Sequence, residues 1–187
     1  MLHVIVNQGE YPVGQPTRRG RGKAGSGWNP ELGLARGSRA YAFKTNSLYK
    51  VGNCYYQTDN ACARVKRVWG TLINRSAARH PAQSRVGKLA RNIGDDGGHL
   101  IASRFYGTGQ PINLVPMNSR INQAGGAWYR MEQDIDYYLR LNRGIAVGID
   151  IIIHYPDEVS LRPSAFTVIV RFNAGRDHRR YDIINTL

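Results

Sequence analysis

The pattern of apolar and polar positions predicts strands towards the end of the chain. Ile145 to Tyr155 and Ala165 to Phe172 are rich in Ile and Val, and the stretch between them contains proline. Because β-branched residues favour a pleated sheet, both segments predict sheet strands. An earlier segment, Tyr49 to Gln57, is also rich in β-favouring residues, and a turn signal at Thr58-Asp59-Asn60 separates it from Ala61 to Ile73. These two segments predict a hairpin.

A different period appears between residues 127 and 141, where apolar side chains recur three or four positions apart. This spacing places them along one face of a long helix. They are Trp128, Met131, Ile135, Tyr138 and Leu139. Stripes of this kind usually pack into a core, so we assign this one to packing rather than to a cofactor site. Together the elements predict an α+β fold with a central antiparallel sheet and flanking helices.

The start of the chain has another composition. Leu2 to Val6 predicts a short strand, whereas Gly9 to Ala40 is rich in Gly, Arg and Pro and contains TRRGRGK at positions 17 to 23. We therefore divide the chain into an irregular basic arm over residues 1–40 and one folded domain over residues 41–187. The arm is either a contact to nucleic acid or a linker to a delivery domain. Arg75 to Arg91 is basic and polar and predicts a short helix.

Charge indicates the kind of partner. The chain has 26 Lys and Arg against 13 Asp and Glu, a formal net charge of +13. Such a surface attracts polyanions, most obviously a phosphate backbone. Acidic lipid and an acidic protein inhibitor are the alternatives. The chain has neither a long apolar run nor the features of a signal peptide at Met1 to Gln8, so we expect neither a membrane span nor a signal peptide.

The two cysteines, Cys54 and Cys62, lie in the predicted hairpin. A local disulfide and two free thiols are both compatible with this spacing. Two cysteines alone are too few for a structural zinc site.

The candidate chemistry is concentrated between Asp95 and Glu132. His99 follows two glycines and is expected to open a strand at Leu100 to Ala102, and Ile112 to Val115 predicts a second strand. A turn then leads into a helical segment that contains Asn122. A strand-strand-helix unit of this kind can place a histidine opposite an asparagine.

These residue types suit phosphodiester hydrolysis. A histidine titrates near neutrality and can deprotonate water. The negative charge that develops on phosphate oxygens requires a hard cation, and Mg²⁺ keeps most of its waters and needs few protein ligands. One Asn oxygen can hold it, while a nearby carboxylate such as Glu132 accepts hydrogen bonds from the metal-bound waters.

The same block resembles a known family. Asp96-Gly97-Gly98-His99 followed by Asn113-Leu114-Val115-Pro116-Met117, Asn122, Trp128 and Glu132 is similar to the DNA/RNA non-specific endonucleases, whose active site is a ββα-metal finger. The resemblance covers roughly Tyr55 to Phe172 and is strongest to the branch found as toxin domains of bacterial secreted effectors.

The resemblance implies a role for each matching residue. His99 is implied as general base, Asn122 as the direct ligand of Mg²⁺ with Mn²⁺ as a substitute, and Glu132 as an outer carboxylate. Asn113 is implied as a clamp inside the finger, and Asp96 either as a structural residue or as one that orients the histidine loop. Arg64 is our candidate for contact with phosphate.

Two departures from the family pattern bear on these roles. Gly97 stands where the better-known motif has arginine, so Arg64, Arg91 or Arg104 must supply the charge that contacts nucleic acid. The Ala124-Gly125-Gly126 stretch lengthens the path from Asn122 to Glu132 and is expected to break the helix between them.

The sequence thus predicts a metal-dependent endonuclease that cuts DNA, with RNA as a second substrate. We expect an antibacterial toxin domain, secreted or delivered into target cells and neutralised by an immunity protein with an acidic face. The alternatives are a nutritional or defensive secreted nuclease, a nucleic-acid-binding module without catalysis, and a basic domain that engages an acidic protein.

Overall fold

The computed structural model describes residues 3–4, 43–75 and 92–186. Apart from His3 and Val4, the predicted basic arm lies outside this range, as do the candidate Arg91 and all but Arg75 of the helix predicted from Arg75 to Arg91. The strands and helices are β1 (His3–Val4), β2 (Leu48–Val51), β3 (Cys54–Thr58), β4 (Val65–Leu72), β5 (Asp95–His99), β6 (Leu114–Asn118), α1 (Ser119–Asn122), α2 (Ala127–Leu141), β7 (Val147–His154), β8 (Ala165–Phe172) and β9 (Asp177–Ile184), with 3-10 turns η3 (Pro111–Asn113) and η4 (Asn173–Gly175).

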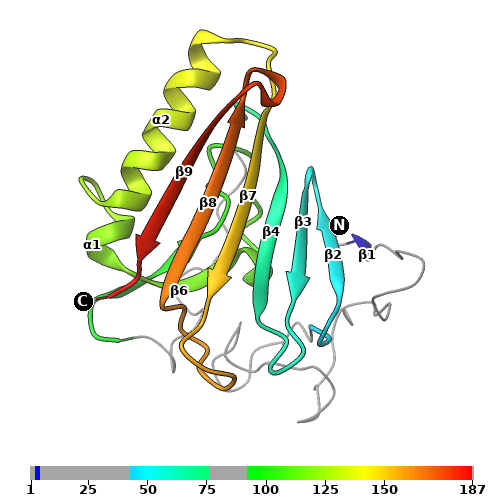
Figure 1. The fold of residues 1–187 in the computed structure, drawn as a ribbon, viewed down its shortest axis with the longest axis vertical. Coiled ribbons are helices and arrows are strands. Elements are labelled where there is room, and N and C mark those ends of the chain that lie inside the picture. Colours follow the sequence, from blue (N-terminus) through cyan, green and yellow to red (C-terminus); the bar gives the residue numbers. More distant parts are fainter. Residues whose placement is uncertain (1–2, 5–42, 76–91, 187) are drawn as a thin grey trace.

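One large antiparallel sheet forms the body of the fold. Its strand order is β1-β2-β3-β4-β7-β8-β9, and β5 and β6 form a separate two-stranded sheet. Figure 1 shows α2 lying alongside β8 and β9, with β6 behind the sheet. This arrangement confirms the α+β class with a central antiparallel sheet.

The core lies between the large sheet and α2. The helix buries Trp128, Met131, Ile135 and Leu139, which are four of the five side chains that define its apolar stripe. The Trp128 ring meets Phe166 of β8 edge-on, with ring centroids 4.9 Å apart. Each fully buried large apolar side chain stabilises the fold by about 1.5–3 kcal/mol. The stripe therefore holds α2 against the sheet, as its periodicity predicts.

The predicted strands at both sides of the helix are largely confirmed, but the first hairpin is divided differently. The expected strand from Tyr49 to Gln57 is two strands, β2 and β3, joined by a tight turn at Gly52 and Asn53. Gly52 has a φ of +58°, a conformation that glycine adopts at low cost. The Gly-Asn pair was therefore a turn signal inside an apolar run, and the prediction of one continuous strand was wrong.

Strand β9 was not predicted. Its sequence, DHRRYDII, is mostly polar and its side chains are mostly exposed. It pairs with β8 along its whole length, from Ala165 opposite Ile184 to Phe172 opposite Asp177. An edge strand with many charges resists pairing with other chains, so the polarity that hid this strand from the pattern suits its position.

The finger strands are shifted from their expected positions. His99 is the last residue of β5, whereas it was expected to open a strand at 100–102. Strand β6 runs from Leu114 through Pro116 to Asn118, whereas the second strand was expected from Ile112 to Val115. The sequence DDGGH has little β propensity. Close packing determines the pairing instead, because a Cβ at Gly98 would lie 2.6 Å from the Cβ of Met117 on β6.

The helices of the described residues include none that is long and apolar enough to cross a membrane.

Candidate active site

The end of helix α1 is tied to strand β5 by a side-chain hydrogen bond. Asn122 Nδ2 donates to Asp96 Oδ2 at 3.0 Å, and the neighbouring Gln123 Nε2 donates to the same oxygen at 3.1 Å. His99 ends the strand that Asp96 belongs to. The finger therefore brings the helix that carries Asn122 onto the strand that carries the histidine.

This contact also fixes the orientation of the Asn122 amide. A carboxylate accepts hydrogen bonds and cannot donate them, so the amide nitrogen must face Asp96. The carboxamide oxygen is then left for another ligand, and within the described part of the chain no donor is bonded to it. Asp96 was expected to be structural or to orient the histidine loop. In the structure it accepts a hydrogen bond directly from Asn122.

Asn113 braces the loop that follows His99. Its Oδ1 accepts from the backbone N–H of Ile101 at 2.9 Å, and its Nδ2 donates to the carbonyls of Ile101 at 2.8 Å and Thr108 at 2.7 Å. Tyr56 of β3 donates to the same Oδ1 at 3.1 Å. The Asn113 side chain thus forms with the Ile101 backbone the two hydrogen bonds that a neighbouring strand would form. Its bond with Tyr56 links the loop to the large sheet. This geometry agrees with the clamp implied for Asn113.

Glu132 lies about one turn into α2, beside the guanidinium of Arg104. Its Oε1 accepts from Trp128 Nε1 at 3.1 Å, and its Oε2 lies 3.6 Å from Arg104 Nη2. Burial raises the pKa of Glu132 to about 7, against the opposing effects of Arg104 and of the hydrogen bond from Trp128. A carboxyl with such a pKa is sensitive to any cation placed near it.

The helix is broken between Asn122 and Glu132, as expected from the Ala124-Gly125-Gly126 stretch. Helix α1 ends at Asn122, and Gly126 caps α2, which begins at Ala127. A Cβ at Gly126 would lie 2.2 Å from the carbonyl oxygen of Ile121, so the two helices approach more closely than a larger residue permits. The break therefore folds α2 back against α1.

The donor set suits a hard divalent cation with few protein ligands. Over residues 3–4, 43–75 and 92–186, no group of three His, Cys, Asp or Glu side chains is close enough to hold a metal ion. A carboxamide oxygen with a carboxylate nearby requires no such group, because Mg²⁺ retains several waters that outer carboxylates can bind. The oriented oxygen of Asn122 fits this requirement.

A family model confirms what the block of residues indicated. The model for DNA/RNA non-specific endonucleases matches residues 45–174, which is more than half of the chain and contains the whole finger. The chain belongs to the DNA/RNA non-specific endonuclease family. It is a nuclease of this family with a finger of two strands and a short helix.

A curated relative of this endonuclease is a secretion-system protein. The chain is 34% identical over 130 residues to the type VII secretion system protein EssD of Staphylococcus aureus. The match covers 67% of this chain but only 21% of EssD. The chain thus spans about a fifth of the length of the curated relatives it matches.

Solved structures show the same fold. The endonuclease resembles NucA from Streptococcus agalactiae, solved with magnesium bound, with a TM-score of 0.55, 17% identity and coverage of 76% of this chain and 83% of NucA. It also resembles the Sda1 nuclease, solved with bound zinc, with a TM-score of 0.60, 14% identity and coverage of 77% and 79%.

The contacts of Arg64 do not match the phosphate contact expected for it. Its side chain is 6% exposed, pairs with Asp59 and donates to the carbonyls of Asp157 and Ser160. Its guanidinium also lies over the Tyr155 ring, 4.2 Å from the centroid. With its donors bound to these partners, Arg64 braces the loop between β7 and β8, and the expectation that it contacts phosphate is not supported.

Arg104 is the candidate arginine that the endonuclease fold brings beside helix α2. Its side chain is 35% exposed, near Glu132, and lies 5.9 Å from the centre of the Tyr129 ring. Arg91 lies outside the described residues. Of the three arginines suggested in place of an arginine at position 97, Arg104 is therefore the one that is both described and partly exposed.

Two residues of the site were not assigned from the sequence. Gln123 shares Asp96 with Asn122, and Trp128 both packs in the core and donates to Glu132. Adjacency to Asn122 was the available signal for Gln123. The four-residue spacing from Trp128 to Glu132 was the signal for the second contact, because such residues are neighbours on a helix.

The two cysteines are free thiols, with Cys54 buried and Cys62 partly exposed. Burial raises the pKa of Cys54 to about 11, so its thiol is unreactive at neutral pH. The sulfur of Cys62 donates to the carbonyl of Glu158 at 3.2 Å. Neither thiol takes part in the finger.

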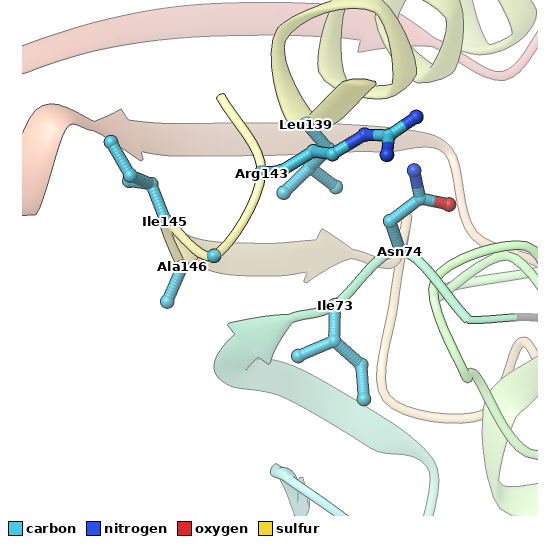
Figure 2. A pocket seen from close by; sticks show the side chains of 7 residues that line it. Ile73, Asn74, Leu139, Arg143, Ile145 and Ala146 are labelled. Atoms are coloured by element: carbon cyan, nitrogen blue, oxygen red, sulfur yellow. The ribbon is translucent and has the colours of Figure 1, made fainter. Parts of the chain in front are cut away.

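A separate surface pocket lies where α2 ends and the chain enters β7. Figure 2 shows Arg143 and Asn74 on one side of it, and Ile145 and Ala146 on the other. Its lining includes none of the residues predicted for the active site. We therefore assign no part of the cleavage chemistry to it.

Proposed function

We propose that this domain is a divalent-metal-dependent endonuclease that hydrolyses phosphodiesters, in which His99 is the general base and Asn122 holds the metal. The observation that carries the proposal is the hydrogen bond from Asn122 to Asp96, which orients the amide oxygen on a finger whose first strand ends in His99. DNA is the expected substrate, with RNA as the second.

Each side chain has one task in the reaction. His99 accepts a proton from the attacking water, the water oxygen bonds to phosphorus, and the bond from phosphorus to the leaving oxygen breaks. Arg104 neutralises charge on the nonbridging oxygens. Asn122 would hold the cation through its amide oxygen, and Glu132 would accept hydrogen bonds from waters around it.

The cation, when bound, supplies positive charge for the leaving and nonbridging oxygens as negative charge accumulates there. Mg²⁺ is our first choice and Mn²⁺ a substitute. The structures of NucA with magnesium and of Sda1 with zinc support a divalent cation in this fold.

Substrate binding should depend on charge rather than on base sequence. A net charge of +13 provides strong attraction for phosphates, and contacts to phosphate position nucleic acid without reading its sequence. This favours cutting with little specificity.

The decisive experiment compares three purified proteins on plasmid DNA and on single-stranded RNA, with Mg²⁺, Mn²⁺ or a chelator. Wild type should cut only with a divalent metal, His99→Ala should bind DNA without cutting it, and His178→Ala should cut normally because His178 lies exposed on β9. Undiminished cutting by His99→Ala would refute the assignment of the base. Tight binding by wild type without any cutting would instead support a non-catalytic binding module.

We further propose that the domain acts as a secreted antibacterial toxin neutralised by an acidic immunity protein. The similarity to part of a much longer type VII secretion system protein supports export as one piece of a larger polypeptide. The basic surface suits an acidic partner. Expression in bacteria should kill the cells with loss of chromosomal DNA, while His99→Ala should be harmless; equal growth of both strains would count against the toxin role.

A further inference from the structure

A buried polar cluster lies at the base of the finger and has no part in the chemistry above. The Asp95 side chain is fully buried and receives two hydrogen bonds from Arg162, Nε to Oδ2 at 2.6 Å and Nη2 to Oδ1 at 2.8 Å. The backbone N–H of Asn92 donates to the same carboxylate at 2.9 Å. Paired nitrogens and oxygens of this kind fix direction as well as distance.

Asn185 completes the cluster. Arg162 Nη1 donates to its backbone carbonyl, and Asn185 Nδ2 donates to the carbonyls of Pro116 at 3.1 Å and Pro163 at 2.8 Å. Its Oδ1 accepts from the backbone N–H of Asn118 at 2.8 Å. The side chain is completely buried, and both of its donors and its acceptor are used.

The cluster holds the point from which both parts of the proposed active site extend. Asp95 begins β5, whose last residue is His99, and it pairs in register with Asn118 at the end of β6. Asn118 in turn caps α1 by accepting from the backbone N–H of Arg120 at 2.8 Å, and α1 ends at Asn122. His99 and Asn122 are therefore each four residues from the same corner.

A small rotation at this corner becomes a large displacement at the site. Four residues of a strand span about 13 Å, so a tilt of about 5° at Asp95 moves His99 by about 1 Å. A displacement of about 1 Å between reacting groups can slow a reaction by about 100-fold. Rigid attachment of the finger base is thus a requirement of the chemistry.

We infer that Arg162 and Asn185 are positioning residues that fix the metal ligand Asn122 and the base His99 relative to each other. The inference rests on the proposed metal-binding role of Asn122. Asn185 lies beyond residue 174, where the family match ends, so the family pattern does not extend to it.

The alternative is that the cluster only stabilises the fold. Loss of stability alone would reduce the folded fraction and leave each folded molecule with its normal metal affinity. A positioning role predicts weaker metal binding by fully folded protein. The two are separated by measuring Mn²⁺ binding without substrate, by calorimetry or electron paramagnetic resonance, at a temperature well below each melting midpoint.

Arg162→Lys is the main variant, because lysine keeps the charge but lacks the planar fork. We expect Mn²⁺ binding about 10-fold or more weaker, in the range found for residues that support metal ligands, and cutting about 100-fold slower. Arg180→Lys is the matched control, since Arg180 forms an exposed ion pair with Asp182 on β9 and should behave as wild type. Wild-type Mn²⁺ affinity in folded Arg162→Lys overturns the inference.

Asn185→Ser provides the test if Arg162→Lys does not fold. It keeps the backbone carbonyl that Arg162 uses and removes the side-chain link to Asn118, so the same weakening of Mn²⁺ binding is expected. Asn122→Ala distinguishes a failure of the proposed metal ligand from a failure of the positioning inference. If that variant binds Mn²⁺ as wild type does, the proposed metal ligand is wrong. If it fails to bind while Arg162→Lys and Asn185→Ser bind normally, only the positioning inference fails.

Discussion

Replacement of Glu132 by glutamine should stabilise the protein at neutral and alkaline pH. Burial raises the pKa of this carboxyl from an ordinary value of 4.5 to about 7, so the folded protein holds its proton more tightly than the unfolded chain does. Below about pH 4.5 the group is protonated in both states and costs nothing. Above about pH 7 the folded protein carries a buried negative charge, so the free energy of unfolding has fallen between about pH 4.5 and pH 7.

The magnitude follows from the size of the shift. Each pKa unit corresponds to about 1.4 kcal/mol, so a rise from 4.5 to about 7 amounts to about 3 kcal/mol at pH 8. The side chain is only 14% exposed, so solvent screening removes little of this. Because a neutral glutamine also pairs less well with Arg104, about 3 kcal/mol is an upper value, equivalent to about 6–12 °C in Tm for a domain of this size.

The assay is urea denaturation of wild type and Glu132→Gln between pH 4.5 and 8 in metal-free buffer. The difference in unfolding free energy should be near zero at the acidic end and grow until pH 8. Glu158→Gln, in an exposed loop, controls for the loss of one negative charge from a strongly basic protein. A difference that is constant across this pH range would refute the reasoning, because it would show that the carboxyl titrates alike in both states.

Three further substitutions test other contacts. Arg64→Ala should lower the free energy of unfolding by about 3–5 kcal/mol because Asp59 is left buried without its cation, and the folded variant should cut normally below its melting point. Loss of cutting with unchanged stability would instead support a phosphate-binding role for Arg64. Arg104→Ala should raise KM and, in a catalytically inactive background, reduce the slope of log affinity against log salt by about 1; an unchanged slope would exclude phosphate contact. Gly70→Ala should cost about 1–3 kcal/mol, seen as a lower urea midpoint, because the new Cβ would lie 2.2 Å from the carbonyl oxygen of Asn53; an unchanged midpoint would contradict that packing.

The large sheet and the helix were readable from the sequence because hydrophobic burial determines them. The stretch from 127 to 141 is a helix with the predicted bounds, and β7 and β8 fall where Ile and Val are concentrated. Strand β9 was missed because its position at the sheet edge requires few apolar residues. The split at Gly52 was missed because two strands joined by a tight turn keep one continuous apolar composition.

The residue types of the candidate site were proposed from the sequence, but their geometry was not. The family match covers the whole block that contains them, and the structure adds the bond that orients Asn122. The position of Arg64 depends on a partner 93 residues away in sequence, the carbonyl of Asp157, and no local pattern reports such a contact. The link from Arg162 to Asp95 spans 67 residues and was invisible for the same reason.

Carboxamides hold the finger together where its strands cannot. The DDGGH strand provides almost no apolar surface. Asn113 supplies hydrogen bonds to the loop that follows it, and Asn118 and Asn185 supply hydrogen bonds that anchor β6, the strand with which it pairs. Carboxamides do not titrate in the physiological range, so these links keep their strength as pH changes. Burial raises the pKa of one carboxyl of the proposed site, Glu132, to about 7. A pH–rate profile of this domain should therefore report the titration of Glu132 rather than loosening of the finger.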